Sequence, residues 1–141
     1  MNEQVWTFEH SVECDASRNF AWAYWTNVAN WNDPPAKFEL DGPFTVGSRL
    51  TTILPDQTMQ SVIRSVEPGT AATIEMRLPG GILSFNWMFE DLSETRSRIT
   101  QRLELSTEDV ALVAQASMLE QTVPQGMEKL IAAIERCACD D

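Results

Sequence analysis

The sequence from Ala71 to Leu105, AATIEMRLPGGILSFNWMFEDLSETRSRITQRLEL, predicts three consecutive β-strands. Two short turns, at 79–81 and 91–94, separate the predicted strands Ala71–Leu78, Ile82–Glu90 and Thr95–Leu105. Parallel strands would need long crossover connections, so turns this short imply that the three strands pair antiparallel.

The side chains distinguish the two faces of these strands. In the middle strand the large apolar residues fall on alternate positions: Leu83, Phe85, Trp87 and Phe89. In the last strand Ile99, Leu103 and Leu105 share one side with a single polar residue, Gln101. Because the opposite faces are mostly polar, only one side of the sheet is predicted to be covered.

The chain from 38 to 66 continues this pattern toward the N-terminus. Further strands are predicted at Phe38–Leu40, Gly47–Leu54 and Met59–Val66, with turn residues between them. In the last of these, Ile63 and Val66 are three residues apart, which breaks the alternation and indicates a β-bulge that bends the sheet. Pro34-Pro35 ends the segment before these strands, because neither proline can donate a helical hydrogen bond.

The N-terminal segment Gln4–Glu13 alternates as a half-buried strand does, with Trp6, Phe8, His10 and Val12 on one face. Asp15 and Ser17 then provide capping side chains for a short helix that ends near Trp25. A second short helical turn is predicted over Asn27–Trp31.

The C-terminal third is predicted to be helical. Residues 106–109, STED, suit a capped helix start, and the helical pattern continues to Cys139. One apolar stripe at helical spacing contains Met127, Leu130, Ile131, Ile134 and Ala138. Pro124 and Gly126 interrupt it, so a kink or break is expected near Thr122–Gln125. We find no linker or repeat, and we expect one folding unit over residues 1–141.

The net charge of the chain is −11 at pH 7, from 21 acidic and 10 basic residues. Binding to nucleic acid or to an anionic membrane needs clustered Lys and Arg, so neither partner is expected. No apolar run approaches the ~18 residues of a membrane span, and the first residues do not resemble a signal peptide. Three cysteines without a C-x-x-C pair (Cys14, Cys137, Cys139) favour a reduced compartment, and we expect a cytoplasmic protein.

The order of elements, one strand, two short helices, a six-stranded meander and a long helix, resembles the START-like (birch-pollen-allergen-type, SRPBCC) superfamily. Within it, the chain is most similar to the bacterial polyketide cyclase/dehydrase-like group. The similarity is clearest at 16–22, ASRNFAW, and 27–31, NVANW, where the family shows a polar cap, an apolar-Trp pair and a second Trp. The segments 44–50, 66–69 and 95–100 look like its strand-opening glycine, its hairpin Pro-Gly and the start of its last strand.

This resemblance implies an α+β helix-grip fold. A curved antiparallel sheet of about seven strands would wrap around the long C-terminal helix, with two short helices after the first strand and a cavity between sheet and helix. The superfamily uses that cavity for lipids, sterols, polyketides, plant hormones and aromatic compounds. A few members are enzymes, and one branch acts as a co-chaperone of a heat-shock ATPase.

We therefore expect the protein to bind a small, mostly apolar molecule such as a lipid, polyketide or aromatic compound, without a cofactor. One alternative is a cyclase- or dehydratase-type enzyme that uses the same cavity. Another is a co-chaperone-like interaction module, which would need an exposed apolar patch. A homodimer is compatible with a small domain of this kind, although the sequence indicates no surface for one.

Two polar side chains on predicted inward faces are candidates to orient a ligand. His10 is the only histidine, and an imidazole suits acid–base catalysis or a hydrogen bond to a ligand hydroxyl. Gln101 would be a buried amide that needs a partner, which either the protein or a ligand could supply. Each also has a plainer interpretation as a hydrogen-bonded core residue.

Seven apolar residues are further candidates for the cavity wall: Trp31, Met76, Phe85, Trp87, Phe89, Met118 and Met127. Rings can stack on a flat ligand and methionines can adapt to irregular shapes, but both also fill cores. Arg64 would suit a ligand carboxylate if it pointed inward, while burial statistics favour an outward position. One histidine and three scattered cysteines give no metal-ligand spacing, and the sequence assigns no catalytic residue.

Overall fold

A seven-stranded antiparallel sheet in the order β1-β7-β6-β5-β4-β3-β2 forms the centre of the fold. The structure is a computed structural model that describes residues 4–31 and 36–139. Its strands are β1 Gln4–Cys14, β2 Lys37–Leu40, β3 Arg49–Ile53, β4 Thr58–Glu67, β5 Ala71–Leu78, β6 Gly81–Asp91 and β7 Ser97–Thr107. The predicted meander from β2 to β7 is confirmed, and β1 joins it at the far edge beside β7.

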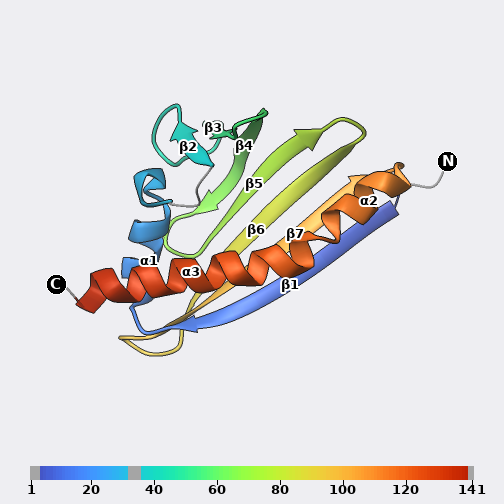
Figure 1. Ribbon diagram of the computed structural model, residues 1–141. Helices are drawn as coiled ribbons and strands as arrows, with labels where there is room; N and C mark the ends of the chain where they lie inside the picture. The colour runs from blue at the N-terminus through green and yellow to red at the C-terminus, as the bar shows by residue number, and fades with distance from the viewer. Residues whose placement is uncertain (1–3, 32–35, 140–141) are drawn as a thin grey trace.

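Short helices follow β1, as predicted, and a long helix ends the chain (Figure 1). The helices are α1 Arg18–Trp25, the 3₁₀-helix η1 Val28–Asn30, α2 Val110–Ala116 and α3 Leu119–Cys139. Ser17 caps α1, since its hydroxyl accepts a hydrogen bond from the Phe20 N–H at 3.2 Å. The predicted end of the helical segment at Pro34-Pro35 lies outside the described residues.

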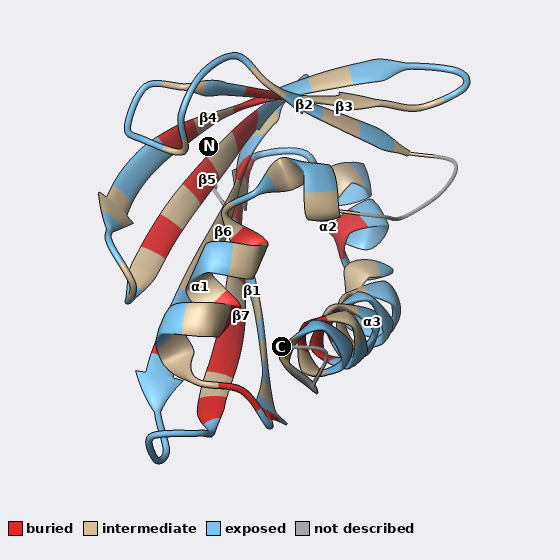
Figure 2. Cartoon of the chain, turned by 90° about the vertical axis from the view of Figure 1, so that its left-hand side faces the viewer, coloured by how far each residue is buried: buried red, intermediate tan, exposed pale blue. Residues whose placement is uncertain are grey.

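The sheet curves around α3, as a view nearly along this helix shows (Figure 2). Buried residues alternate along the strands, so that Ile99, Gln101, Leu103 and Leu105 of β7 are all buried. The chain therefore has the helix-grip arrangement expected from its sequence, with one face of the sheet covered by helices.

The predicted β-bulge in β4 is confirmed. The pairing of β4 with β5 shifts register between Ile63 and Ser65, so Arg64 is the extra residue. Its side chain is exposed and its Nε donates to Glu75 Oε1 at 3.3 Å. Arg64 thus lies on the solvent side of the sheet, which removes it as a partner for a ligand inside the fold.

The helical break lies earlier in the chain than predicted. A kink or break was predicted near Thr122–Gln125; the break is wrong, because α3 continues through Pro124 and the interruption falls at Ser117–Met118. There the Ser117 hydroxyl donates to the Ala114 carbonyl at 2.7 Å, which ends α2. The missing N–H of Pro124 affects only the second turn of α3, where Glu120 is exposed and water can satisfy its carbonyl.

The helical region also begins later than the predicted 106–109. Strand β7 extends to Thr107, which pairs with Gly81 of β6. Asp109 is the cap of α2, and its carboxylate accepts from the Ala111 N–H at 2.9 Å. Pairing on both sides, with β1 and β6, keeps Ser106 and Thr107 in the sheet.

The buried apolar residues form two clusters. The larger, which we call the main core, lies under α1 and α3 and includes Trp25, Phe89, Ile99 and Ile134. The smaller, which we call the small core, lies under α2 and consists of Met76, Leu83, Leu105 and Ala116. Phe85 packs against both clusters.

Candidate functional site

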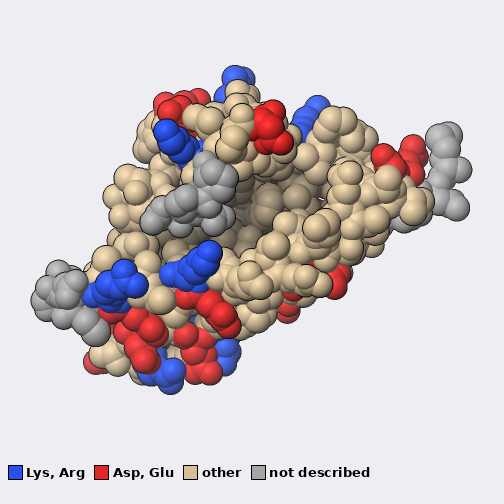
Figure 3. Space-filling model, in the orientation of Figure 1, with Lys and Arg blue, Asp and Glu red and all other residues tan. Residues whose placement is uncertain are grey.

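A pocket of about 510 Å³ opens between α3, the α1–η1 corner and the sheet. Figure 3 shows a hollow in this face of the molecule, with Lys and Arg side chains along the side formed by α3. The lining residues are Tyr24, Trp25, Asn30, Trp31, Phe38, Trp87, Gly126, Lys129, Leu130, Ala132, Ala133 and Arg136. Its volume lies within the roughly 300–1,000 Å³ typical of small-molecule sites.

Four aromatic rings make a continuous wall of this pocket. The ring centroids of Trp25 and Trp31 lie 6.0 Å apart with an interplanar angle of 29°, a stacked arrangement. Trp31 in turn meets Phe38 edge to face at 5.3 Å, and Trp25 lies 4.9 Å from Trp87. Rings in these geometries support one another and offer flat apolar surface to a ligand.

The polar atoms of the α1–η1 corner are occupied by the protein itself. The indole N–H of Trp31 donates to the Trp25 carbonyl at 2.6 Å, and the Asn30 amide donates to the Tyr24 carbonyl at 3.0 Å. Burial raises the pKa of the Tyr24 phenol, and the neighbouring Cys137 raises it further, so the phenol is neutral near pH 7. These bonds fix the aromatic wall in place.

Small residues on α3 leave the space that the pocket occupies. Gly126 and Ala133 lie on a single face of the helix. A Cβ atom built on Gly126 would meet nothing within 4 Å, so the space beside this residue is open. Bulky side chains at these positions would close the pocket.

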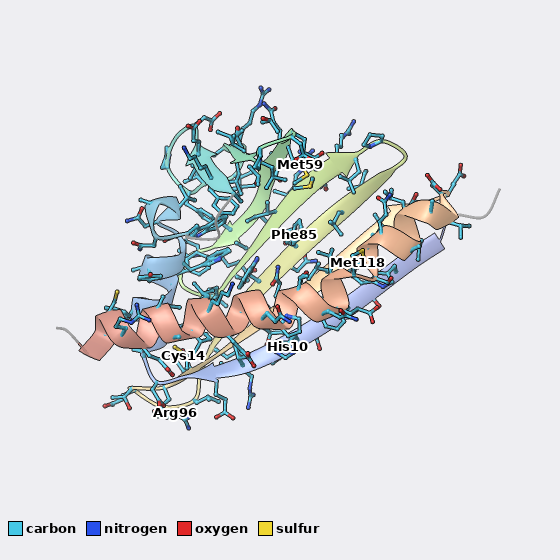
Figure 4. The ribbon with its side chains drawn as sticks, in the orientation of Figure 1. His10, Cys14, Met59, Phe85, Arg96 and Met118 are labelled. Atoms are coloured by element: carbon cyan, nitrogen blue, oxygen red, sulfur yellow. The ribbon has the colours of Figure 1, made fainter. Side chains whose placement is uncertain are left out.

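The predicted wall residues are divided between the pocket and the core beneath it. Trp31 and Trp87 line the pocket. Phe89 and Met127 are 1 % and 2 % exposed and belong to the main core. Phe85 lies in the middle of the sheet (Figure 4).

His10 and Gln101 face each other across β1 and β7, and Gln101 faces Trp87 across β7 and β6. These side chains therefore form one row on the concave face of the sheet, which places His10 about 10 Å from Trp87 at the usual strand spacing. Figure 4 places His10 beside α3. Its Nε2 atom is buried and has no hydrogen-bond partner among the described residues, and Gln101 is 6 % exposed.

Two of the predicted methionines lie away from this pocket. Met76 is 8 % exposed and belongs to the small core. Met118 is 68 % exposed, because it occupies the turn between α2 and α3 (Figure 4). Neither residue is part of the pocket lining.

Several lining residues were not anticipated from the sequence. On α3, the spacing of Gly126, Lys129, Leu130 and Ala133 is itself a helix-face signal that marks one wall. Tyr24 and Trp25 stand in the short helix after the first strand, in which the sequence analysis identified no candidate pocket residue. Phe38 had no detectable signal, because its place opposite Trp31 depends on how β2 returns to the α1–η1 corner.

A second hollow, about 520 Å³, lies at the β5–β6 hairpin around Gly80 and Gly81. It has no aromatic wall and contains both Arg77 and Glu108, so it offers little to an apolar ligand.

Within residues 4–31 and 36–139, no three His, Cys, Asp or Glu side chains gather as a metal site. Over the same residues no helix has the length and apolar character to cross a membrane.

Solved structures of other proteins share this arrangement. Norcoclaurine synthase from Thalictrum flavum, in complex with dopamine and hydroxybenzaldehyde, matches with a TM-score of 0.75 and 14% identity over 98% of this chain and 88% of the synthase. The di-domain ARO/CYC StfQ from the steffimycin biosynthetic pathway matches with a TM-score of 0.74 and 17% identity, over 96% of this chain and 51% of StfQ. A protein from Arthrobacter aurescens matches with a TM-score of 0.67 and 21% identity, over 92% of this chain and 86% of that protein.

These likenesses show that the chain has the same helix-grip fold as these proteins. At the level of sequence, no protein-family model and no curated protein matches it.

Proposed function

We propose that the protein binds a small, mostly apolar molecule in the pocket lined by Trp25, Trp31 and Trp87. The observation that carries this proposal is the continuous aromatic wall around about 510 Å³. Each Å² of apolar surface that a ligand buries there contributes about 25 cal/mol. Ring stacking adds a preference for flat ligands.

His10 and Gln101 do not line the pocket themselves, and we propose that they orient a ligand that extends past Trp87 toward them. They stand in the same row as Trp87, and the His10 Nε2 atom has no hydrogen-bond partner among the described residues. A buried nitrogen without a partner costs free energy, so a ligand hydroxyl or carbonyl that reaches it gains affinity.

The known relatives in fold agree with a ligand of this kind. The synthase described above was solved with dopamine and hydroxybenzaldehyde, two small aromatic molecules. Because fold alone does not determine function, this agreement supports the class of ligand and no particular compound.

The free thiols of Cys14 and Cys137 fit our proposal that the protein acts in the cytoplasm.

The decisive test fills the pocket from the side of α3. Gly126→Leu places a side chain into the open space beside the helix, while Gly126→Ala is the matched control that changes the helix but adds only one methyl group. With the neutral fluorescent probe N-phenylnaphthylamine, we expect Gly126→Leu to weaken binding at least about tenfold, a change of 1.4 kcal/mol. Gly126→Ala should bind within about twofold of the wild type. A wild-type protein that does not bind the probe, or a Gly126→Leu protein that binds it equally, would contradict the proposal.

The buried Nε2 atom of His10 favours one second candidate, an enzyme that uses this imidazole as general base. A cyclase- or dehydratase-type reaction needs a proton removed next to a carbonyl group. In that case His10→Ala should abolish turnover of an aromatic polyketide-type substrate while ligand binding persists. Unchanged turnover in His10→Ala would exclude it.

A further inference from the structure

We propose that the pocket selects apolar molecules that carry one anionic head group, such as a carboxylate, and that Lys129 and Arg136 bind that group. This inference rests on the proposed function, because it specifies the ligand of the same pocket. It identifies the mouth of the pocket as the charged end of the site and the aromatic wall as its apolar end.

The two cations project from one face of one helix. Lys129 and Arg136 are seven residues apart on α3, which is about two helical turns or 10 Å along the axis. Both line the pocket together with Leu130 and Ala133, which lie on the same helix face. Figure 3 shows Lys and Arg side chains on the α3 side of the hollow. An anionic group at the mouth can therefore reach both side chains.

The charged residues that line the pocket have the opposite sign to the net charge of the molecule. The chain has 21 acidic and 10 basic residues, yet the described lining contains Lys129 and Arg136 and no acidic residue. The carboxylates nearest in sequence on α3 are directed elsewhere, since Glu128 is absent from the lining and Glu135 accepts a hydrogen bond from the Asp15 N–H at 2.8 Å. A local positive site on a strongly acidic protein favours one type of ligand, an anion.

Lys129 and Arg136 have no acidic partner within the described chain. Elsewhere in the described chain, arginines 18, 64, 96 and 102 each form an ion pair with an Asp or Glu side chain, whereas the remaining basic residues, like Lys129 and Arg136, form none. Of the other polar groups at the mouth, the Trp31 indole N–H and the Asn30 amide already donate to backbone carbonyls. The ammonium and guanidinium groups are the charged donors of the lining that a ligand can use, and both match carboxylate oxygens well.

Two fluorescent probes of nearly the same shape test this inference. Anilinonaphthalene sulfonate carries one negative charge that N-phenylnaphthylamine lacks. Lys129→Met and Arg136→Met, singly and together, remove the positive charges and keep apolar side chains of similar length. The double variant Arg64→Met/Arg102→Met is the matched control, because it changes the net charge equally at exposed positions on the outer face of the sheet.

The wild type should bind the sulfonate more tightly than the neutral probe. An exposed ion pair contributes up to about fivefold in affinity, so the Lys129→Met/Arg136→Met protein should lose about tenfold for the sulfonate. Its affinity for the neutral probe should stay within about twofold. The control variant should bind both probes as the wild type does, and added salt should weaken only sulfonate binding.

The outcomes separate this inference from the proposed function. Equal loss of both probes in the Lys129→Met/Arg136→Met protein, or equal loss of sulfonate binding in the control, would overturn the anion site and leave the apolar pocket in place. Failure of the wild type to bind either probe would overturn the pocket itself.

Discussion

The indole ring of Trp25 lies against that of Trp87, with centroids 4.9 Å apart and ring planes inclined by 38°. Trp25 is only 2 % exposed and also contacts Trp22, Phe44 and Phe89. One residue is therefore both a central part of the main core and a wall of the pocket. Stability and the proposed ligand binding are linked at this position.

This double role predicts that alanine substitutions at two pocket tryptophans differ in their effect on stability. Trp25→Ala should lower the free energy of unfolding by about 3–5 kcal/mol, because a large fully buried ring is removed. Trp31→Ala should cost less than half as much, since Trp31 is only partly buried at the mouth. Urea denaturation followed by circular dichroism measures both values. Equal losses would show that Trp25 is not central to the core.

Gly81 should not tolerate a side chain. A Cβ atom there would lie 2.8 Å from Leu112 Cδ2 and 2.9 Å from the Ser106 carbonyl oxygen. The backbone oxygen cannot move aside, so Gly81→Ala should destabilise the protein by about 1–3 kcal/mol through overpacking where α2 meets the sheet. A urea midpoint equal to that of the wild type would contradict this expectation.

Substitution of Gly126 by alanine should have the opposite effect on stability. Gly126 lies inside α3, its φ angle is not positive, and its Cβ would meet no atom within 4 Å. Alanine restricts the unfolded chain and favours the helix, so Gly126→Ala should stabilise the protein by about 0.5–1 kcal/mol. Thermal unfolding of the Gly81→Ala and Gly126→Ala proteins compares the two substitutions. Shifts of the melting temperature in the same direction would refute this prediction.

Cys14 should be unreactive in the native protein. It is 0 % exposed, and burial raises the pKa of its thiol to about 11, with the negative charge of Glu135 as a second cause. Iodoacetamide should therefore leave Cys14 unmodified until the protein is denatured, whereas the exposed Cys137 should react at once. Peptide mass spectrometry before and after denaturation reads out both sites.

The same thiol predicts a loss of stability in alkali. Its pKa is about 11 in the folded protein against 9.0 for the ordinary thiol, so between these values the unfolded chain releases a proton that the folded chain retains. This contribution is fully present below pH 9 and is lost as the pH rises toward 11. The free energy of unfolding should fall more steeply over this range in the wild type than in Cys14→Ala. Parallel slopes would mean that Cys14 is not the titrating group.

Most of the fold could be predicted from local patterns. Alternation in Ile82–Glu90 fixed which face of β6 is inward, and the broken alternation between Ile63 and Val66 located the bulge. The helical break could not be located in this way. Pro124 is the strongest local breaker, but the interruption at Ser117–Met118 comes from hydrogen bonds at the end of α2, which has no strong sequence signal.

The candidate site was predicted less completely than the fold. Trp31 and Trp87 were identified, because aromatic residues at the mouth and on an inward face are natural pocket walls. Met118 was misplaced, since its outward position follows from the break that the sequence did not locate. The juxtaposition of Phe38 with Trp31 is a tertiary contact that no local pattern specifies.

The division of the interior into two cores affects how this protein can change over time. The small core of Met76, Leu83, Leu105 and Ala116 includes none of the pocket residues. It can hold β5, β6, β7 and α2 together while substitutions accumulate on the opposite side of Phe85. Since most substitutions destabilise a protein and only those below a stability threshold are eliminated, this reserve lets the pocket explore new shapes. If the pocket binds a ligand as we propose, a lineage built on this architecture can exchange one ligand for another without first rebuilding its scaffold.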